Sequence, residues 1–169
     1  MAPQVDEVLV VVATVQSVEV LDGSTRLPTF AVPYQFLFVI LHLFRESWFE
    51  RTVRAGADTL YKYADVLRLW FRHTEVLVAE VGQLTECFGI ADPVIWVLGH
   101  TDRIFSTGIV EALGLASRVD EDWLFSARAS GGAPLRWRGS MRQRLHARDR
   151  AELLDGAVSR ATELELGSW

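Results

Sequence analysis

The chain has 169 residues, half of them hydrophobic, with 22 acidic and 17 basic side chains and a formal net charge of -5. This composition is sufficient for one sizeable buried core and excludes a disordered chain. The negative charge argues against a protein that binds a polyanion through its overall charge.

Cellular location is indicated by the single cysteine and by the length of the apolar runs. Cys87 alone cannot form an intramolecular disulfide or a multi-cysteine zinc site, which is typical of a reducing cytoplasm. The longest apolar run, residues 36–44, is much shorter than the roughly 20 residues of a membrane-spanning helix. Asp6 and Glu7 precede the apolar residues 8–12, so no secretory signal is expected. We therefore expect a cytoplasmic protein with no membrane contact.

Residues 1–27 are predicted to form an N-terminal strand segment. The apolar residues 8–12 and the alternation that follows them as far as Val20 are typical of a strand. Asp22 and Gly23 are a turn signal and favour a hairpin with a short partner strand.

Residues 28–125 are predicted to form a helical domain. Pro33 precedes the apolar run 36–44, which we expect to be its first, buried helix. His42 within that run is expected to be a core histidine. Residues 94–98 are short, apolar and rich in β-branched side chains, so the pattern fits either a strand or a buried helix.

The clearest helical pattern lies at residues 59–72, with Asp58 or Thr59 as the N-cap. The helix can continue to Cys87, before Gly89 and Pro93 interrupt it. Its apolar stripe is expected to face the core and to pack on the helix at 36–44. The stripe consists of Leu60, Tyr63, Ala64, Leu67, Trp70 and Phe71.

Residues 126–150 are predicted to be an Arg-rich linker, in which seven arginines stand against the single acid Asp149. This local excess of positive charge could bind a polyanion although the whole chain is acidic. Residues 151–169 have apolar side chains at helical steps and are predicted to form a C-terminal helix. The predicted fold is therefore mainly α, a helical bundle preceded by a short N-terminal β strand pair.

Thr59, Tyr63 and Leu67 stand at four-residue steps and are followed by Arg68, Leu69, Trp70 and Phe71. This pattern resembles the core-binding helix of the tyrosine recombinase (phage integrase) family. Residues 103–113 stand where the last helix of that domain is expected. The resemblance implies an N-terminal core-binding (SAM-like) domain without the catalytic domain.

The same resemblance implies a function in DNA integration or recombination, with double-stranded DNA as the partner. Its helices would rest on the duplex, and its Arg-rich linker would lie along phosphates. The expected DNA-binding residues are Arg51, Arg54, Thr59, Lys62, Arg68, Arg136, Arg138, Arg142 and Arg144.

The chain alone is not expected to be an enzyme. Residues 72–74 and 98–101 resemble the Arg-His and Leu-Gly-His parts of the recombinase active site, but the family's tyrosine nucleophile follows both motifs. All three tyrosines here precede them, namely Tyr34, Tyr61 and Tyr63. No cofactor is expected.

Metal and thiol chemistry are not expected either. The four histidines are scattered, with no i, i+4 pair and no nearby cysteine, so the sequence indicates no metal site. Cys87 lacks a local His or Lys partner and is expected to be a buried structural cysteine.

Two other interpretations remain open. A helical protein rich in Trp and Phe could bind a protein partner or self-associate, with no nucleic acid involved. An enzyme with an apolar pocket is the third interpretation, although the sequence shows no clustered acid, base and nucleophile.

Overall fold

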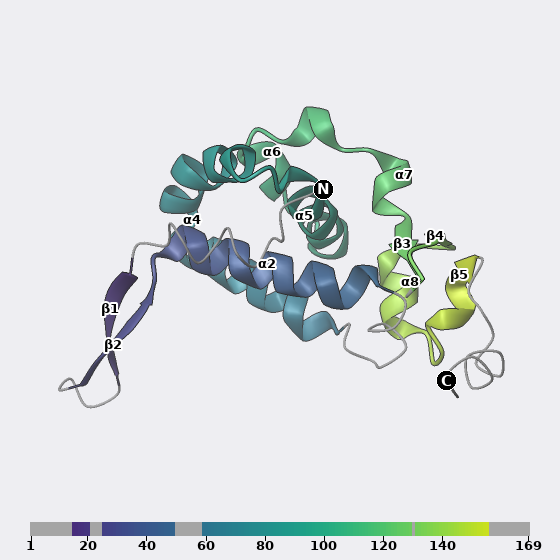
Figure 1. Cartoon of the computed structure of the whole chain (residues 1–169), viewed down its shortest axis with the longest axis horizontal. Helices are drawn as coiled ribbons and strands as arrows, with labels where there is room; N and C mark the ends of the chain where they lie inside the picture. Colours follow the sequence, from purple (N-terminus) through teal and green to yellow (C-terminus); the bar gives the residue numbers. More distant parts are fainter. Residues whose placement is uncertain (1–14, 21–24, 50–58, 130, 156–169) are drawn as a thin grey trace.

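The computed structural model describes residues 15–20, 25–49, 59–129 and 131–155. Three helices form the body of the protein, which confirms the mainly α prediction (Figure 1). They are α2 (Val32–Trp48), α4 (Leu60–Cys87) and α5 (Ala91–Phe105). Short elements follow: α6 (Ile109–Ala112), the 3-10 turn η1 (Ala116–Arg118) and α7 (Glu121–Leu124).

The predicted N-terminal strand pair is present. Strands β1 (Val15–Val20) and β2 (Thr25–Phe30) are antiparallel, and the pairing begins with Val15 opposite Phe30. In Figure 1 this hairpin projects from one end of the helical body. Residues 8–12 and the Asp22–Gly23 turn lie outside the described residues.

Helix α2 begins earlier and ends later than the apolar run 36–44 that predicted it. Pro33 lies in its first turn, where the missing N–H has no helical partner to lose. The buried side is formed by Phe36, Leu37, Ile40, Leu43 and Ser47, at helical spacing.

The core position predicted for His42 is wrong. Its helical phase lies away from the buried stripe, and 49% of its side chain is exposed. The ring stacks on Phe38, with centroids 6.3 Å apart, and its Nε2 lies 3.3 Å from a carboxylate oxygen of Glu46. The apolar run extends around α2 beyond the side that packs on the core. His42 lies in that part of the run and is therefore on the surface.

Helix α4 extends to Cys87 as predicted, with one break. His73 has non-helical dihedrals (φ -135, ψ 26), and the Thr74 hydroxyl donates to the Trp70 carbonyl oxygen at 2.7 Å. Thr59 occupies the N-cap position but makes no capping hydrogen bond through its side chain. The buried residues keep a helical spacing on both sides of the break: Tyr63, Val66, Trp70, Leu77, Val81 and Thr85.

The predicted stripe of α4 is only partly buried. Tyr63 and Trp70 lie in the core, and the Trp70 ring lies 6.3 Å from that of Phe36 on α2, so the predicted packing of these two helices is confirmed. The burial predicted for Leu60 and Phe71 is wrong, because these residues are 45% and 66% exposed. They lie at the start and at the edge of the stripe, beyond the reach of the neighbouring helix.

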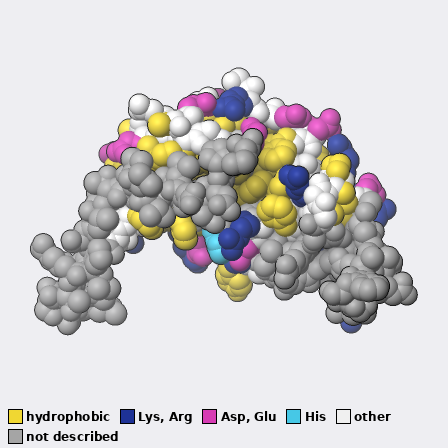
Figure 2. Space-filling view, viewed as in Figure 1, with side chains coloured by type: hydrophobic (Ala, Val, Ile, Leu, Met, Phe, Trp, Pro, Cys, Tyr) yellow, Lys and Arg dark blue, Asp and Glu magenta, His cyan; other side chains and the backbone are white. Residues whose placement is uncertain are grey.

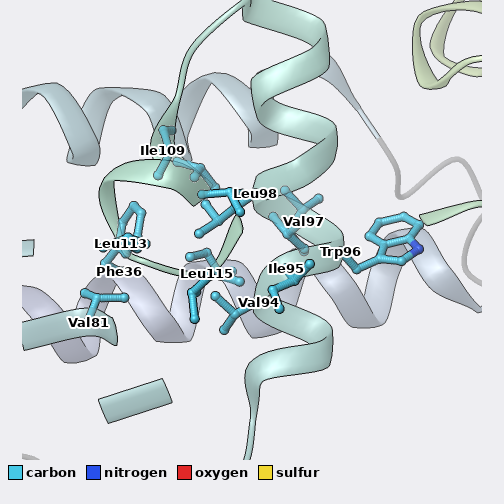
Figure 3. Packing of buried hydrophobic residues seen from close by; sticks show 14 of the residues in the cluster. Phe36, Val81, Val94, Ile95, Trp96, Val97, Leu98, Ile109, Leu113 and Leu115 are labelled. Carbon is cyan, nitrogen blue, oxygen red and sulfur yellow. The ribbon is translucent and has the colours of Figure 1, made fainter. Parts of the chain in front are cut away.

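Residues 94–98 form a helix, as part of α5, and every residue from 94 to 101 is buried. Figure 3 shows Val94, Val97 and Leu98 of α5 among side chains from α2, α4 and α6. Residues 94–98 are apolar and buried on every side, so they show no polar face. For this reason their pattern did not distinguish a strand from a helix.

The prediction of a single helix at residues 103–113 is wrong. Helix α5 ends at Phe105, and Ser106 adopts a left-handed conformation (φ 57, ψ 46). The Asp102 carboxylate then accepts hydrogen bonds from the Thr107 hydroxyl (2.6 Å) and from the backbone N–H groups of Ile109 (2.9 Å) and Val110 (3.0 Å). One side chain thus satisfies two of the orphan backbone donors at the start of α6 and fixes the corner.

The Arg-rich residues 126–150 are not a linker. They form β3 (Ser126–Arg128), β4 (Pro134–Trp137) and α8 (Met141–His146). Beyond them, η2 (Ala151–Leu153) and β5 (Leu154–Asp155) replace the beginning of the predicted C-terminal helix, and residues 156–169 lie outside the described part. The three strands make an antiparallel sheet in the order β3-β4-β5. Its small core consists of Ala127, Leu135, Trp137 and Leu154.

Candidate functional sites

Arg144 was expected to contact DNA, but only 1% of it is exposed, so that role is wrong. Ser140 and Gln143 form a capping box at the start of α8, which fixes the phase of the helix and turns Met141 and Arg144 inward. The burial could not be foreseen from local composition, since the residues around Arg144 are mostly polar.

The Arg144 guanidinium is held by aromatic rings and by the backbone. It lies 3.8 Å from the centre of the Trp137 ring and 5.7 Å from that of Trp96. It also donates a hydrogen bond to the backbone carbonyl oxygen of Ser47, at the end of α2. A desolvated cation is strongly attracted to aromatic faces, so Arg144 attaches α8 to α2 and α5.

His100, like Thr101, is a buried polar residue of α5, and it lies beside the same tryptophan as Arg144. Its Nε2 lies 2.9 Å from the Leu124 carbonyl oxygen, and its ring packs edge-on against Trp96 at 4.4 Å. Burial, and then the positive charge of Arg144, lower the pKa of His100 to about 3. The imidazole is therefore neutral at pH 7, and because Leu124 offers only an acceptor, Nε2 carries its hydrogen.

A small cavity of about 10 Å³ lies between α5 and the β4–α8 segment. It is lined by His100, Leu124, Phe125, Trp137, Gly139, Ser140, Met141 and Arg144. The sequence drew attention to residues 98–101 only as a partial recombinase motif, and nothing in it connects them with residues 137–144.

Four of the residues expected to contact phosphate lie beside carboxylates. Lys62 pairs with Glu46. Three arginines have their acid within hydrogen-bond distance: Arg68 with Asp65 (2.6 Å), Arg136 with Asp122 (2.7 Å) and Arg138 with Asp155 (3.0 Å). Thr59 is half-buried, and Arg51 and Arg54 lie outside the described residues.

The same interspersion of charges extends over other parts of the surface. Arg103 pairs with Glu121, and Arg118 pairs with Glu86. In Figure 2, acidic and basic side chains lie next to one another along the edge that carries α6 and α7. Such pairing leaves little net positive potential where it occurs.

Among the described residues, basic side chains without an ion-paired carboxylate lie on α8 and just after it. Arg142 is exposed and donates to the Ile104 carbonyl oxygen at 3.1 Å. His146 and Arg148 are also exposed, and none of the three has an ion pair with a carboxylate among the described residues. These three residues are named the α8 basic group below.

An apolar pocket of about 240 Å³ lies between α2 and α4. It is lined by Phe38, Val39, His42, Leu43, Lys62 and Asp65 and is named the α2–α4 pocket below. Phe38 is 52% exposed, and its ring lies 6.3 Å from that of Phe30, which is 39% exposed. The sequence signal that could have located it is the position of Phe38, on α2 but out of phase with the buried stripe.

The structure also bears on the sequence predictions about metal ligands, membrane-spanning helices and the cysteine, over the described residues. It contains no group of three or more His, Cys, Asp and Glu residues that could hold a metal ion, and no helix there could span a bilayer. Cys87 is exposed rather than buried as expected, because it follows the last buried position of α4 and lies off its core-facing side.

Comparison with known proteins gives no assignment. No protein-family model, curated protein or solved structure matches this chain significantly.

Proposed function

We propose that this chain is a non-catalytic, cytoplasmic protein-interaction module that takes up an apolar side chain of a partner protein in the α2–α4 pocket. A second copy of the chain is its simplest partner. The observation that carries the proposal is the pocket itself, open beside an exposed phenylalanine. Its volume of about 240 Å³ exceeds the roughly 150 Å³ cavity that holds a benzene molecule.

The rim of the pocket favours an apolar partner. Lys62 is neutralised by Glu46, and Asp65 is neutralised by Arg68. The rim therefore has little net charge, and binding would depend on the apolar area removed from water. Exposed aromatic side chains at the edge of a pocket are typical anchors of protein interfaces.

Sedimentation equilibrium tests the proposal on the full chain. We expect self-association that persists at high salt and that Phe38→Ala weakens about tenfold or more, since losing an interface anchor costs over about 1.4 kcal/mol. Phe71→Ala is the matched control, because Phe71 is also an exposed helical phenylalanine but does not line the pocket. A chain that stays monomeric, or equal effects of the two substitutions, would contradict self-association through this pocket.

The second candidate is a DNA-binding fragment of the tyrosine recombinase type. The α8 basic group supports it, because Arg142 and Arg148 can neutralise phosphates without first leaving an acid. The helix pattern at Thr59, Tyr63 and Leu67 also supports it as a resemblance. The ion pairs at Lys62, Arg68, Arg136 and Arg138 reduce the binding expected from the other candidates.

The two candidates differ in their response to salt. Two phosphate contacts give a slope of log K against log salt of about -2. Fluorescence anisotropy with a random-sequence duplex measures this slope, and the double substitution Arg142→Ala and Arg148→Ala should abolish most of it. Arg136→Ala is the control, since that arginine already pairs with Asp122. No duplex affinity even at low salt would contradict the DNA-binding candidate.

A further inference from the structure

Two residues that line the cavity between α5 and the β4–α8 segment carry buried ring nitrogens. His100 is 3% exposed and Trp137 is 4% exposed, and both line this cavity. The His100 Nδ1 and the Trp137 Nε1 have no hydrogen-bond partner among the described residues. Buried polar groups are normally satisfied, so this pair of atoms requires a partner.

The two atoms have complementary roles. The His100 Nε2 donates to the Leu124 carbonyl oxygen, so Nδ1 carries a free lone pair and is an acceptor. The Trp137 Nε1–H is only a donor. A group that accepts one hydrogen bond and donates another would satisfy both.

The side chains of Ser140 and Met141 at the cavity already have partners. The Ser140 hydroxyl oxygen accepts from the Gln143 backbone N–H at 3.2 Å, and the hydroxyl lies 3.2 Å from the Gln143 amide oxygen. The Met141 sulfur accepts from the Tyr63 hydroxyl at 3.7 Å. The shared partner of His100 and Trp137 is therefore not a neighbouring serine or methionine side chain.

We propose that this cavity is an internal hydration site, in which one water molecule accepts from the Trp137 Nε1–H and donates to the His100 Nδ1. The volume of about 10 Å³ matches the space that a single water requires and excludes a phosphate or a carboxylate ligand. Buried waters typically make two to four hydrogen bonds to such groups. The water would join α5 to β4 and take part in attaching the C-terminal sheet to the helical body.

Nuclear magnetic resonance of the unmodified full chain tests the site directly. We expect a rotating-frame Overhauser contact between the Trp137 indole N–H and water, with the sign that distinguishes proximity from exchange. Oxygen-17 relaxation dispersion should also detect a long-lived internal water. A slowly exchanging Trp137 indole N–H without any contact to water would overturn the proposal.

An isosteric substitution identifies the donor. Replacing Trp137 with 3-benzothienylalanine keeps the ring volume but removes the N–H, and it should reduce the count of long-lived waters by one. The matched control is the same replacement at Trp96. That indole is also buried, also has an unpartnered Nε1 among the described residues and also faces Arg144, but it does not line the cavity. An unchanged count at Trp137, or an equal loss at Trp96, would overturn the assignment.

Discussion

The Arg144 guanidinium lies 3.8 Å from the centre of the Trp137 ring, seven positions earlier in the chain. The cation of α8 thus covers a tryptophan of β4 and also contacts Trp96 of α5. The sequence around Arg144 is typical of a charged surface segment, but Arg144 is buried and connects the C-terminal sheet to the helices.

Arg144→Ala should destabilise the protein by about 2–4 kcal/mol. The substitution removes a buried cation–π contact, leaves the Ser47 carbonyl without its donor and opens a cavity. Arg142→Ala, on the exposed side of the same helix, should stay within about 0.5 kcal/mol. Urea unfolding measures both, and equal shifts of the two midpoints would show that Arg144 is not a core residue.

Phe36→Ala should cost about 3–5 kcal/mol, whereas Phe38→Ala should cost less than about 1 kcal/mol. Phe36 is fully buried against Trp70, and Phe38, two positions later on α2, is half exposed. The comparison by chemical denaturation tests the phase of α2 with one residue type in one helix. A larger cost at Phe38 would mean that the helix presents its other face to the core.

Stability should fall as the pH falls below the ordinary pKa of histidine, 6.5. The pKa of His100 is lowered to about 3, so below pH 6.5 the unfolded chain takes up a proton that the folded chain binds only near pH 3. Between pH 7.5 and pH 5 this group should remove about 2 kcal/mol of stability.

His100→Gln should abolish that part of the pH dependence, measured as urea unfolding free energy at each pH. His42→Gln is the control, because His42 lies on the surface. If the wild type and the His100 variant lost the same stability between pH 7.5 and pH 5, the imidazole would not be buried in its neutral form.

The chain alone should form no covalent adduct with DNA. His100, in the segment that resembles the recombinase Leu-Gly-His motif, is 3% exposed and cannot reach a phosphate. Tyr63 is fully buried, with its hydroxyl directed to the Met141 sulfur. A suicide-substrate assay, with an active tyrosine recombinase as positive control, checks this; a trapped adduct on this chain would disprove it.

Sequence periodicity was sufficient to predict α4, because its residues alternate between buried and exposed positions, and the period-two alternation of the sequence was sufficient to predict the strand pair. It was insufficient to predict α5, where residues 94–99 are all buried and none of them is polar. It also placed His42 inside, because hydrophobicity identified a helix but not which of its faces meets a neighbour.

Less of the candidate sites than of the fold could be predicted from the sequence. The surroundings of Arg144 depend on Ser47, 97 positions away, and on Trp96, and no local pattern connects these residues. The ion pairs of Arg136 and Arg138 join different elements, so a count of charges along the chain overstated the free positive surface. The α2–α4 pocket likewise depends on how two helices meet.

The corner held by Asp102 has a consequence for the order of folding. Its three hydrogen bonds reach partners only five, seven and eight positions ahead. Closing such short loops costs little chain entropy, whereas the Arg144–Ser47 contact must close 97 positions. We therefore expect the α5–α6 corner to form while the C-terminal sheet is still undocked, so the seating of Arg144 would be among the last steps to native structure.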